Sequence, residues 1–327
     1  MMYILLTFIS GATSGKNKSN AKKERTSCMN GFSRTDLASE AILHDSMEGV
    51  RQKVTAFPKG RSETVDIQTE EAARRLGKKQ GRYVTFFTDE MWHLNDDEID
   101  ALSAEIGKEL RHMILKSCHK SALSRTLSVL IAGLGNPHLT ADAIGPETIQ
   151  RLTVTRHIRA YDEGLFRTLS LCSIAAICPG VLGTTGIESA EMLHAITEKT
   201  RPDVLIAVDA LAARSVERLA STVQIADSGI APGAGIGNFR DELSADSLGL
   251  PVIAMGVPTV VDSCAMVLDA LTVAGIAPIP VELEASLQKG KHFFVTPKES
   301  DVITEKVAML LARSIMTALR ISEASRA

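Results

Sequence analysis

The sequence predicts an α/β protein whose core is a mostly parallel, doubly wound sheet with helices on both faces, joined to a smaller N-terminal lobe. After residue 127, short apolar runs alternate with amphipathic helical patterns. This alternation is typical of strand–helix–strand units. The apolar runs lie at residues 129–132, 171–177, 204–208, 251–255 and 292–295. Strands of a parallel sheet are buried on both faces, so uninterrupted apolar runs of this length favour that arrangement.

Helical periodicity separates these runs. We expect helices at residues 146–155, 188–198, 262–274 and 298–319. The last begins with Thr296 as cap, Pro297 in the first helical position and Glu299 completing a capping box. In the N-terminal lobe, apolar spacing predicts helices at 36–54 and 96–115, with a strand at 83–88 between them. Residues 1 to about 33 are polar and rich in Gly, Ser and Lys, so we expect them to be disordered.

Composition excludes several classes of function. The formal net charge is −3 and only 4% of residues are aromatic, which gives no basis for nucleic-acid binding. The apolar run at residues 3–9 is too short to span a bilayer, so no membrane association is expected. Five cysteines, an odd number without a C-x-x-C pair, indicate free thiols in a reducing compartment and hence a cytoplasmic protein.

Two aspartates follow apolar runs. Asp142 comes after the run at 128–132, and Asp209 comes after the run at 204–208. Open α/β sheets form their ligand crevice at the carboxyl ends of strands, so these two carboxylates are expected to meet there. Each aspartate could instead cap the helix that follows it. Two carboxylates that share a site cannot both ionise easily, so the pair can act as base and acid, and hydrolysis is the leading hypothesis.

Cofactor motifs are incomplete. The pair Gly133 and Gly135 suggests a dinucleotide-binding turn, but the third glycine of that fingerprint is replaced by His138. No phosphate-binding loop motif and no metal-ligand spacing of histidines occurs, so we expect neither a cofactor nor a resident metal. The glycine-rich loop around Gly233 and Gly235 fits either a tight turn or a cleft wall whose backbone amides line a bound peptide.

The residues from Gly133 to Asn136, with Asp142 and then Gly145, resemble the opening turn of the hydrogenase-maturation endopeptidases. The longer pattern resembles more closely the germination protease family of endospore-forming bacteria. That likeness covers residues 34–319, and its supporting segments are residues 177–188, 209–215, 227–235, 256–262 and 294–298.

The resemblance implies an atypical aspartic endopeptidase with a core like that of the hydrogenase-maturation proteases. Asp142 and Asp209 would be its catalytic residues. The candidate substrate cleft would include Gly135, Asn136, Gly233 and Gly235. The resemblance also implies a homotetramer in the spore core that acts on small acid-soluble spore proteins. Metal dependence stays open, because the hydrogenase relatives hold a metal of their substrate at the equivalent positions.

The segment Arg34-Thr35-Asp36-Leu37-Ala38-Ser39-Glu40 resembles both the processing site of the family's zymogen and the cleavage sequence of its substrates. The implied cut is Asp36–Leu37. It divides the chain into an extension and propeptide (1–36) and a peptidase domain (37–327), with N-terminal helices and strands at 37–120 and the α/β core at 121–327. The same segment also suits the start of the first helix. A hydrogenase-maturation-type endopeptidase and a non-catalytic peptide-binding scaffold are the alternative functions.

Overall fold

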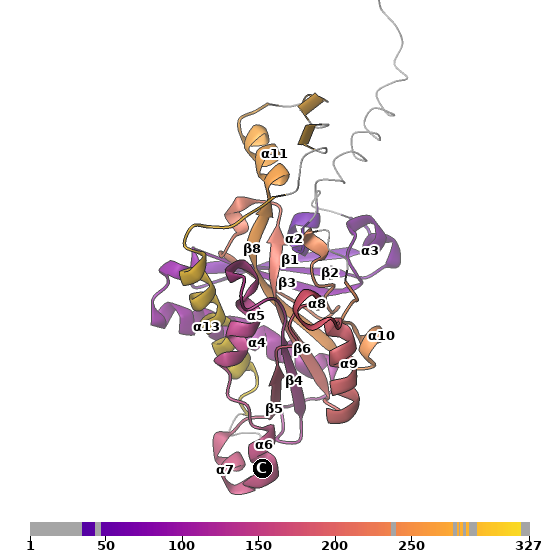
Figure 1. Cartoon of the computed structure of the whole chain (residues 1–327), viewed down its shortest axis with the longest axis vertical. Helices are drawn as coiled ribbons and strands as arrows, with labels where there is room; N and C mark the ends of the chain where they lie inside the picture. The colour runs from indigo at the N-terminus through magenta and orange to yellow at the C-terminus, as the bar shows by residue number, and fades with distance from the viewer. Residues whose placement is uncertain are drawn as a thin grey trace, which may run out of the picture. The chain divides into compact units, whose positions relative to one another are not determined.

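The computed structural model describes residues 35–42, 47–236, 240–276, 280, 282–283, 286–287 and 293–321. All of them belong to one compact unit, residues 34–327. The expected disordered extension, residues 1–33, lies outside the described residues, as does residue 292 of the last expected strand. One sheet forms the centre, with strand order β1-β2-β3-β7-β8-β6-β4-β5 and β9 paired to β8 (Figure 1).

The sheet is mixed, which corrects the expectation of a mostly parallel one. Its parallel part is β5-β4-β6-β8, and the pairs β1-β2, β2-β3, β3-β7, β7-β8 and β8-β9 are antiparallel. The strands are β1 (Val50–Phe57), β2 (Gly60–Ile67), β3 (Gly81–Thr88), β4 (Ser128–Gly133), β5 (Ser173–Ile177), β6 (Val204–Ala213), β7 (Thr222–Ala226), β8 (Val252–Asp262) and β9 (Phe294–Val295). The parallel strands coincide with the apolar runs of the sequence, and the antiparallel extension is what the sequence did not reveal.

Helices cover both faces of this sheet (Figure 1). The long helices α4 (Asp96–Ser117) and α13 (Ser300–Ala318) pack together on one face, whereas α9 (Ser189–Thr200) and α10 (Ala245–Leu248) lie on the other. Other helices among the described residues are α2 (Ala38–Ala41), α3 (Glu70–Leu76), α5 (Ile144–Gln150), α6 (Arg156–Tyr161), α7 (Glu163–Leu169), α8 (Leu182–Thr185) and α11 (Ser263–Val273), and there are 3-10 turns η1 (Met91–His93), η2 (Thr140–Asp142), η3 (Val216–Arg218) and η4 (Ala234–Ile236).

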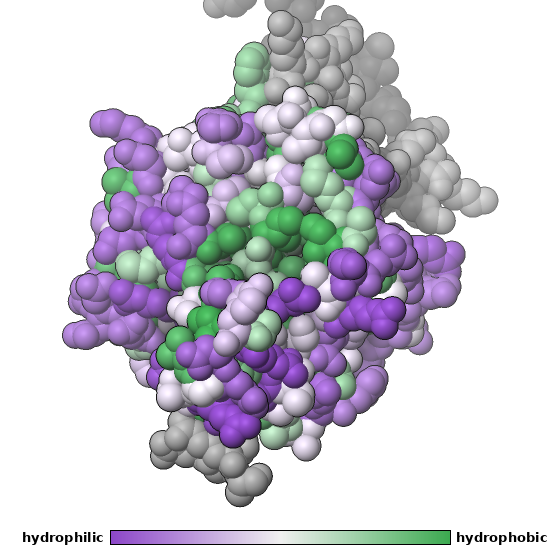
Figure 2. Space-filling view, turned by 60° about the horizontal axis from the view of Figure 1, so that its bottom comes forward, coloured by the Kyte–Doolittle hydropathy of each residue, from purple (hydrophilic) through white to green (hydrophobic). Residues whose placement is uncertain are grey.

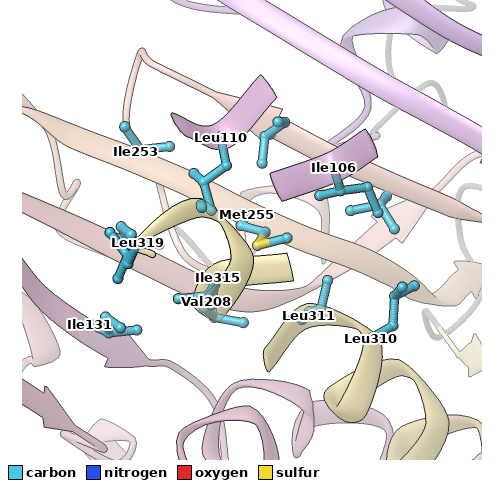
Figure 3. Packing of buried hydrophobic residues seen from close by; sticks show 14 of the residues in the cluster. Ile106, Leu110, Ile131, Val208, Ile253, Met255, Leu310, Leu311, Ile315 and Leu319 are labelled. Atoms are coloured by element: carbon cyan, nitrogen blue, oxygen red, sulfur yellow. The ribbon is translucent and has the colours of Figure 1, made fainter. Parts of the chain in front are cut away.

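The larger core lies between the sheet and the α4–α13 pair. Leu110 of α4 and Ile315 of α13 are fully buried, and they pack with Val208 and Met255 of the sheet (Figure 3). Burying an aliphatic side chain of this size contributes about 1.5–3 kcal/mol. Neighbouring Ala207 points to the opposite face and joins the second core under α9. The strands are therefore rigidly held, and so are the side chains that they carry beyond the core.

Most of the face shown in Figure 2 is hydrophilic. Figure 2 shows one face on which a hollowed apolar area is ringed by hydrophilic side chains. In the part of the chain that the structure describes, no helix is both long enough and apolar enough to cross a bilayer.

Two expected features, a helix and a capping box, are wrong. The helix expected at residues 36–54 is replaced by the short α2 and by β1, whose residues are nearly all exposed and so give no apolar alternation. The capping box at the start of the last helix is also absent. Helix α13 begins after Glu299, whose side chain makes no capping hydrogen bond. The other expected helices agree with the structure to within a few residues at most ends.

Candidate active site

Asp209 lies inside strand β6, not after its end as the sequence suggested. The strand continues to Ala213, paired with β8, so Asp209 cannot cap a helix. Its side chain is only 5% exposed. Its Oδ1 accepts a hydrogen bond of 2.9 Å from the backbone N–H of Ala210. The rigid strand therefore holds a carboxyl group that is almost completely removed from solvent.

Asp142 lies in a different setting, on the turn η2 beyond the end of β4. Its Oδ2 accepts a 2.8 Å hydrogen bond from the backbone N–H of Asn136. Gly135 has φ +107°, and a Cβ at that position would lie 2.0 Å from the backbone oxygen of Asp142, so a side chain does not fit. The hydroxyl of Thr259 donates to the carbonyl of Ala141 at 2.6 Å, which ties the turn to β8. Ala143, not Asp142, is the N-cap residue of α5, so the helix-cap alternative is wrong.

The two aspartates line one cavity of about 200 Å³, together with Asp36 and Arg240. Burial raises the pKa of Asp209 well above its ordinary value, and the charges of Asp142 and Asp36 raise it further. Burial also raises the pKa of Asp142, against the opposing effects of the Asn136 N–H and the Arg240 charge. Because one carboxylate disfavours ionisation of its neighbour, the pair can hold a proton at a pH where isolated aspartates have lost theirs.

The chain's own Asp36 is bound next to this pair. Its backbone N–H donates to the carbonyl of Ala212 at 2.9 Å. The backbone N–H of Ala212 donates back to Oδ2 of Asp36 at 2.8 Å. The next residue, Leu37, is fully buried beside Leu211 and Ala213 of the same strand. Residues 36 and 37 therefore lie along β6, beyond Asp209, in the way that an extended peptide would.

The same segment is fixed at its far end by Glu40, which is buried. Its carboxylate accepts hydrogen bonds from the backbone N–H groups of Arg214 at 2.8 Å and Ser215 at 3.0 Å, and from the hydroxyl of Thr35. Lys78 donates to the carbonyl of Thr35 at 2.6 Å. The charge of Lys78 also lowers the pKa of Asp36, although burial raises that pKa more strongly. Both acidic side chains of the segment thus have specific partners.

Of the four residues expected to form the substrate cleft, two line the cavity, one binds Asp36 and one supports Asp142. Gly135 and Gly233 line the cavity, and the backbone N–H of Gly235 donates a hydrogen bond to the Asp36 carboxylate. Asn136 supports Asp142 instead, and its side-chain oxygen accepts from the N–H of the exposed His138. Residues 237–239, in the last part of the glycine-rich loop, lie outside the described residues.

Sequence reasoning missed three polar residues of this region: Arg240, Lys78 and Gln224. Gln224 does carry a signal, since it is a polar residue within the apolar strand β7 and is buried. Arg240 and Lys78 lie in polar stretches that nothing in the sequence distinguishes from ordinary surface. Among the described residues, no group of three or more His, Cys, Asp or Glu side chains is arranged to hold a metal ion.

Comparison with known proteins identifies related sequences. The family model described as germination protease matches residues 33–274. A germination protease of Clostridium perfringens is 38% identical over 283 residues, which cover 78% of this chain and 83% of the relative. One from Clostridium acetobutylicum is 33% identical over 325 residues, covering 88% and 95%. One from Bacillus cereus is 42% identical over 254 residues, covering 73% and 65%.

Proposed function

The chain belongs to the germination protease family, and on that premise we propose that it is an aspartic-type endopeptidase in which Asp142 and Asp209 hydrolyse small acid-soluble spore proteins. Family membership makes the protein a peptidase. The observation that carries the assignment of the site is that Asp36 lies in the cavity that both aspartates line. A peptide with the sequence of the expected cleavage site thus lies beside the expected catalytic pair.

In the proposed reaction, the pair holds one proton and removes another from water. We assign the starting proton to Asp209, because it is the more deeply buried and its pKa is raised further. Ionised Asp142 accepts a proton as the water oxygen bonds to the carbonyl carbon, and Asp209 donates its proton to the leaving nitrogen as the C–N bond breaks. The second proton then returns from Asp142 to Asp209 through solvent, which restores the pair.

We propose that the enzyme is made as a zymogen that processes itself at Asp36–Leu37, which leaves a mature domain from residue 37. Its substrates would be cut in the same register, after an acidic residue and before an apolar residue followed by Ala-Ser-Glu. The contacts of Asp36 and Glu40 support this specificity, since each carboxylate accepts hydrogen bonds from backbone N–H groups of β6 or its following turn. A homotetramer in the spore core and a core like that of hydrogenase-maturation endopeptidases complete the proposal.

The test compares wild type with Asp142→Asn and Asp209→Asn. Each purified protein is incubated alone, its N-terminus is sequenced, and a small acid-soluble spore protein is then added. We expect the wild type to begin at Leu37 and to cleave the spore protein, and we expect neither event in the variants over the time that the wild type needs. A variant that processes itself at the wild-type rate would contradict the two-aspartate mechanism.

The alternatives have distinct outcomes in the same experiment. A hydrogenase-maturation-type endopeptidase would ignore the spore protein and trim a hydrogenase precursor. A non-catalytic scaffold would bind the spore protein and leave it intact. The family match is to germination proteases, which argues against the hydrogenase-maturation alternative. The Asp36–Leu37 segment beside the aspartates suits a scaffold as well as an enzyme, so cleavage of the spore protein decides between those two.

A further inference from the structure

A buried glutamine contacts the peptide on both sides of the Asp36–Leu37 bond. Nε2 of Gln224 donates a 2.9 Å hydrogen bond to the carbonyl oxygen of Asp36. Oε1 of the same side chain accepts a 2.7 Å hydrogen bond from the backbone N–H of Ala38. One carboxamide therefore binds the carbonyl group that would be attacked and the amide group of the second residue beyond the cut. Both ends of the carboxamide have partners, which fixes its orientation.

The sheet explains how Gln224 and Asp209 come to flank one peptide. Asp209 pairs with Gly256 across β6 and β8, and Gly256 pairs with Gln224 across β8 and β7. Paired residues on neighbouring strands project to the same face, and two strand spacings separate Asp209 from Gln224 by about 10 Å. Gly256 has no side chain to lie between them, and a Cβ there would be only 2.5 Å from the backbone oxygen of Asp209. Asp36 lines a cavity with both Gln224 and Gly256.

We propose that Gln224 is a further catalytic residue, which binds the substrate across the scissile bond and stabilises the charge that forms on its carbonyl oxygen. The inference rests on the proposed function, since it takes Asp36–Leu37 as the bond that is cut. When the water oxygen bonds to the carbonyl carbon, the carbonyl electron pair moves onto oxygen, where the Nε2–H of Gln224 donates. When the C–N bond breaks, the C=O bond forms again and the Leu37 nitrogen takes the proton from the aspartate pair.

The contact to Ala38 contributes differently, by holding the peptide in register. Its N–H is present in both the ground state and the transition state, so this hydrogen bond supports binding and orientation equally in both. The donor to the carbonyl oxygen is expected to strengthen as negative charge develops. Removing a single donor of this kind from an enzyme costs about 10²- to 10³-fold in kcat. The two contacts can therefore be separated by experiment.

The first measurement follows self-processing in the full-length chain. Mass spectrometry records the appearance of the product that begins at Leu37, for wild type, Gln224→Met and Gln224→Glu. Gln224→Glu keeps the side-chain length and an acceptor for the Ala38 N–H but has no donor once its carboxyl group is ionised, so its processing is followed up to alkaline pH. We expect both variants to process about 10²- to 10³-fold more slowly than wild type. Thr85→Val is the matched control, because Thr85 pairs with Gln224 in the neighbouring strand and its buried hydroxyl has no hydrogen-bond partner among the described residues.

The second measurement uses a peptide with the sequence of residues 34–42 as substrate, supplied to the enzymes after their own processing is complete. A matched peptide carries an N-methyl group on the alanine that corresponds to Ala38. For wild type, the methyl group replaces the N–H hydrogen that donates to Oε1 of Gln224, and we expect kcat/KM to fall at least tenfold. For Gln224→Met, the same methylation is expected to change kcat/KM less than threefold, because the partner is already absent.

The outcomes separate this inference from the function on which it rests. If wild type neither processes itself nor cleaves the peptide or the spore protein, the proposed function is wrong and the role of Gln224 falls with it. If wild type does cleave and the Gln224 variants, with unchanged melting temperatures, keep its rate, only the present inference is wrong. An equal effect of methylation on wild type and Gln224→Met would also overturn it. Should Gln224→Met fail to fold, Gln224→Glu and the methylated peptide still decide the question.

Discussion

Asp142 and Asp209 face the same cavity but are held there by different means. Asp209 is part of a central strand, is 5% exposed, and has its pKa raised by burial and by two neighbouring carboxylates. Asp142 lies on a turn, is more exposed, and keeps a backbone N–H and a nearby arginine charge that favour its ionised form. In the proposed reaction, the carboxyl group on the strand retains the proton and the one on the turn loses it.

This difference indicates how one site can contain both an acid and a base. A carboxyl group deep in a sheet cannot be solvated, so its neutral form is favoured. The carboxylate on the turn is less deeply buried, and the Asn136 N–H and the Arg240 charge oppose the rise in its pKa that burial causes. The contrast depends on the surroundings of each residue and not on residue type. Changes to either setting should therefore shift the division of roles between the two aspartates.

The largest expected effect comes from removing either carboxyl group. Asp142→Asn and Asp209→Asn should each lower kcat for a spore-protein peptide by about 10²- to 10⁴-fold, the usual contribution of a general acid or base. The double variant should be only slightly less active than either single variant, because the pair acts as a unit. Single-turnover cleavage assays measure both quantities. Multiplicative losses in the double variant would show that the aspartates act independently.

The turn that holds Asp142 should be the more easily disrupted of the two settings. Gly135→Ala adds a Cβ at 2.0 Å from the backbone oxygen of Asp142, at a φ that alanine rarely adopts. Strain of this kind costs about 1–3 kcal/mol, and displacing a catalytic group by 1 Å can cost about 10²-fold in rate. We expect a loss of activity of that size. Cleavage rates are compared at equal concentrations of folded protein, and circular dichroism measures the folded fraction. Gly183→Ala is the control, since a Cβ there meets no atom within 4 Å.

The sequence predicts the strand that carries Asp209, but it does not predict the full length of that strand. The apolar run at residues 204–208 identified a buried strand, and the position of Asp209 after that run predicted a carboxylate near the ligand crevice. The run did not reveal that β6 continues to Ala213, because the strand beyond Asp209 is stabilised by pairing with β8 and by the bound segment. Local apolar pattern predicts where a strand is buried, and tertiary pairing decides where it ends.

The antiparallel lobe and the peptide contacts were less accessible to prediction. Strand β1 is exposed along most of its length, so its sequence lacks the alternation that marks a half-buried strand. The contact between Gln224 and Asp36 joins residues 188 positions apart. No local pattern encodes such a contact; only the strand order, with β7 beside β8 and β8 beside β6, brings the two residues together.

The burial of Asp209 should also appear in the stability of the protein. Its pKa is raised above the ordinary 3.8 in the folded state, so its favourable contribution is complete below that pH and is lost as pH rises through the folded-state value. At pH 7 the folded protein must either keep Asp209 protonated or bury its charge, and both cost free energy. Asp209→Asn removes that cost, and we expect it to raise the free energy of unfolding at pH 7 by about 0.5–2 kcal/mol. Asp142→Asn should give a smaller increase. Denaturant titrations at pH 7 and pH 4 measure this, and a gain for Asp209→Asn that does not shrink at pH 4 would contradict the explanation.

The smallest expected effect concerns Arg240, whose charge lowers the pKa of both aspartates. Arg240→Gln removes that charge, so both pKa values rise. The pH below which activity is lost and the pH above which it is lost should then both move upward, while the maximal rate changes less than about tenfold, because a partly exposed charge is worth about 0.2–1 kcal/mol. Arg240→Lys should restore the wild-type pH profile, since it restores the charge. If only the acidic side of the profile moves, Arg240 acts on Asp142 alone, and the two settings are more independent than their shared cavity implies.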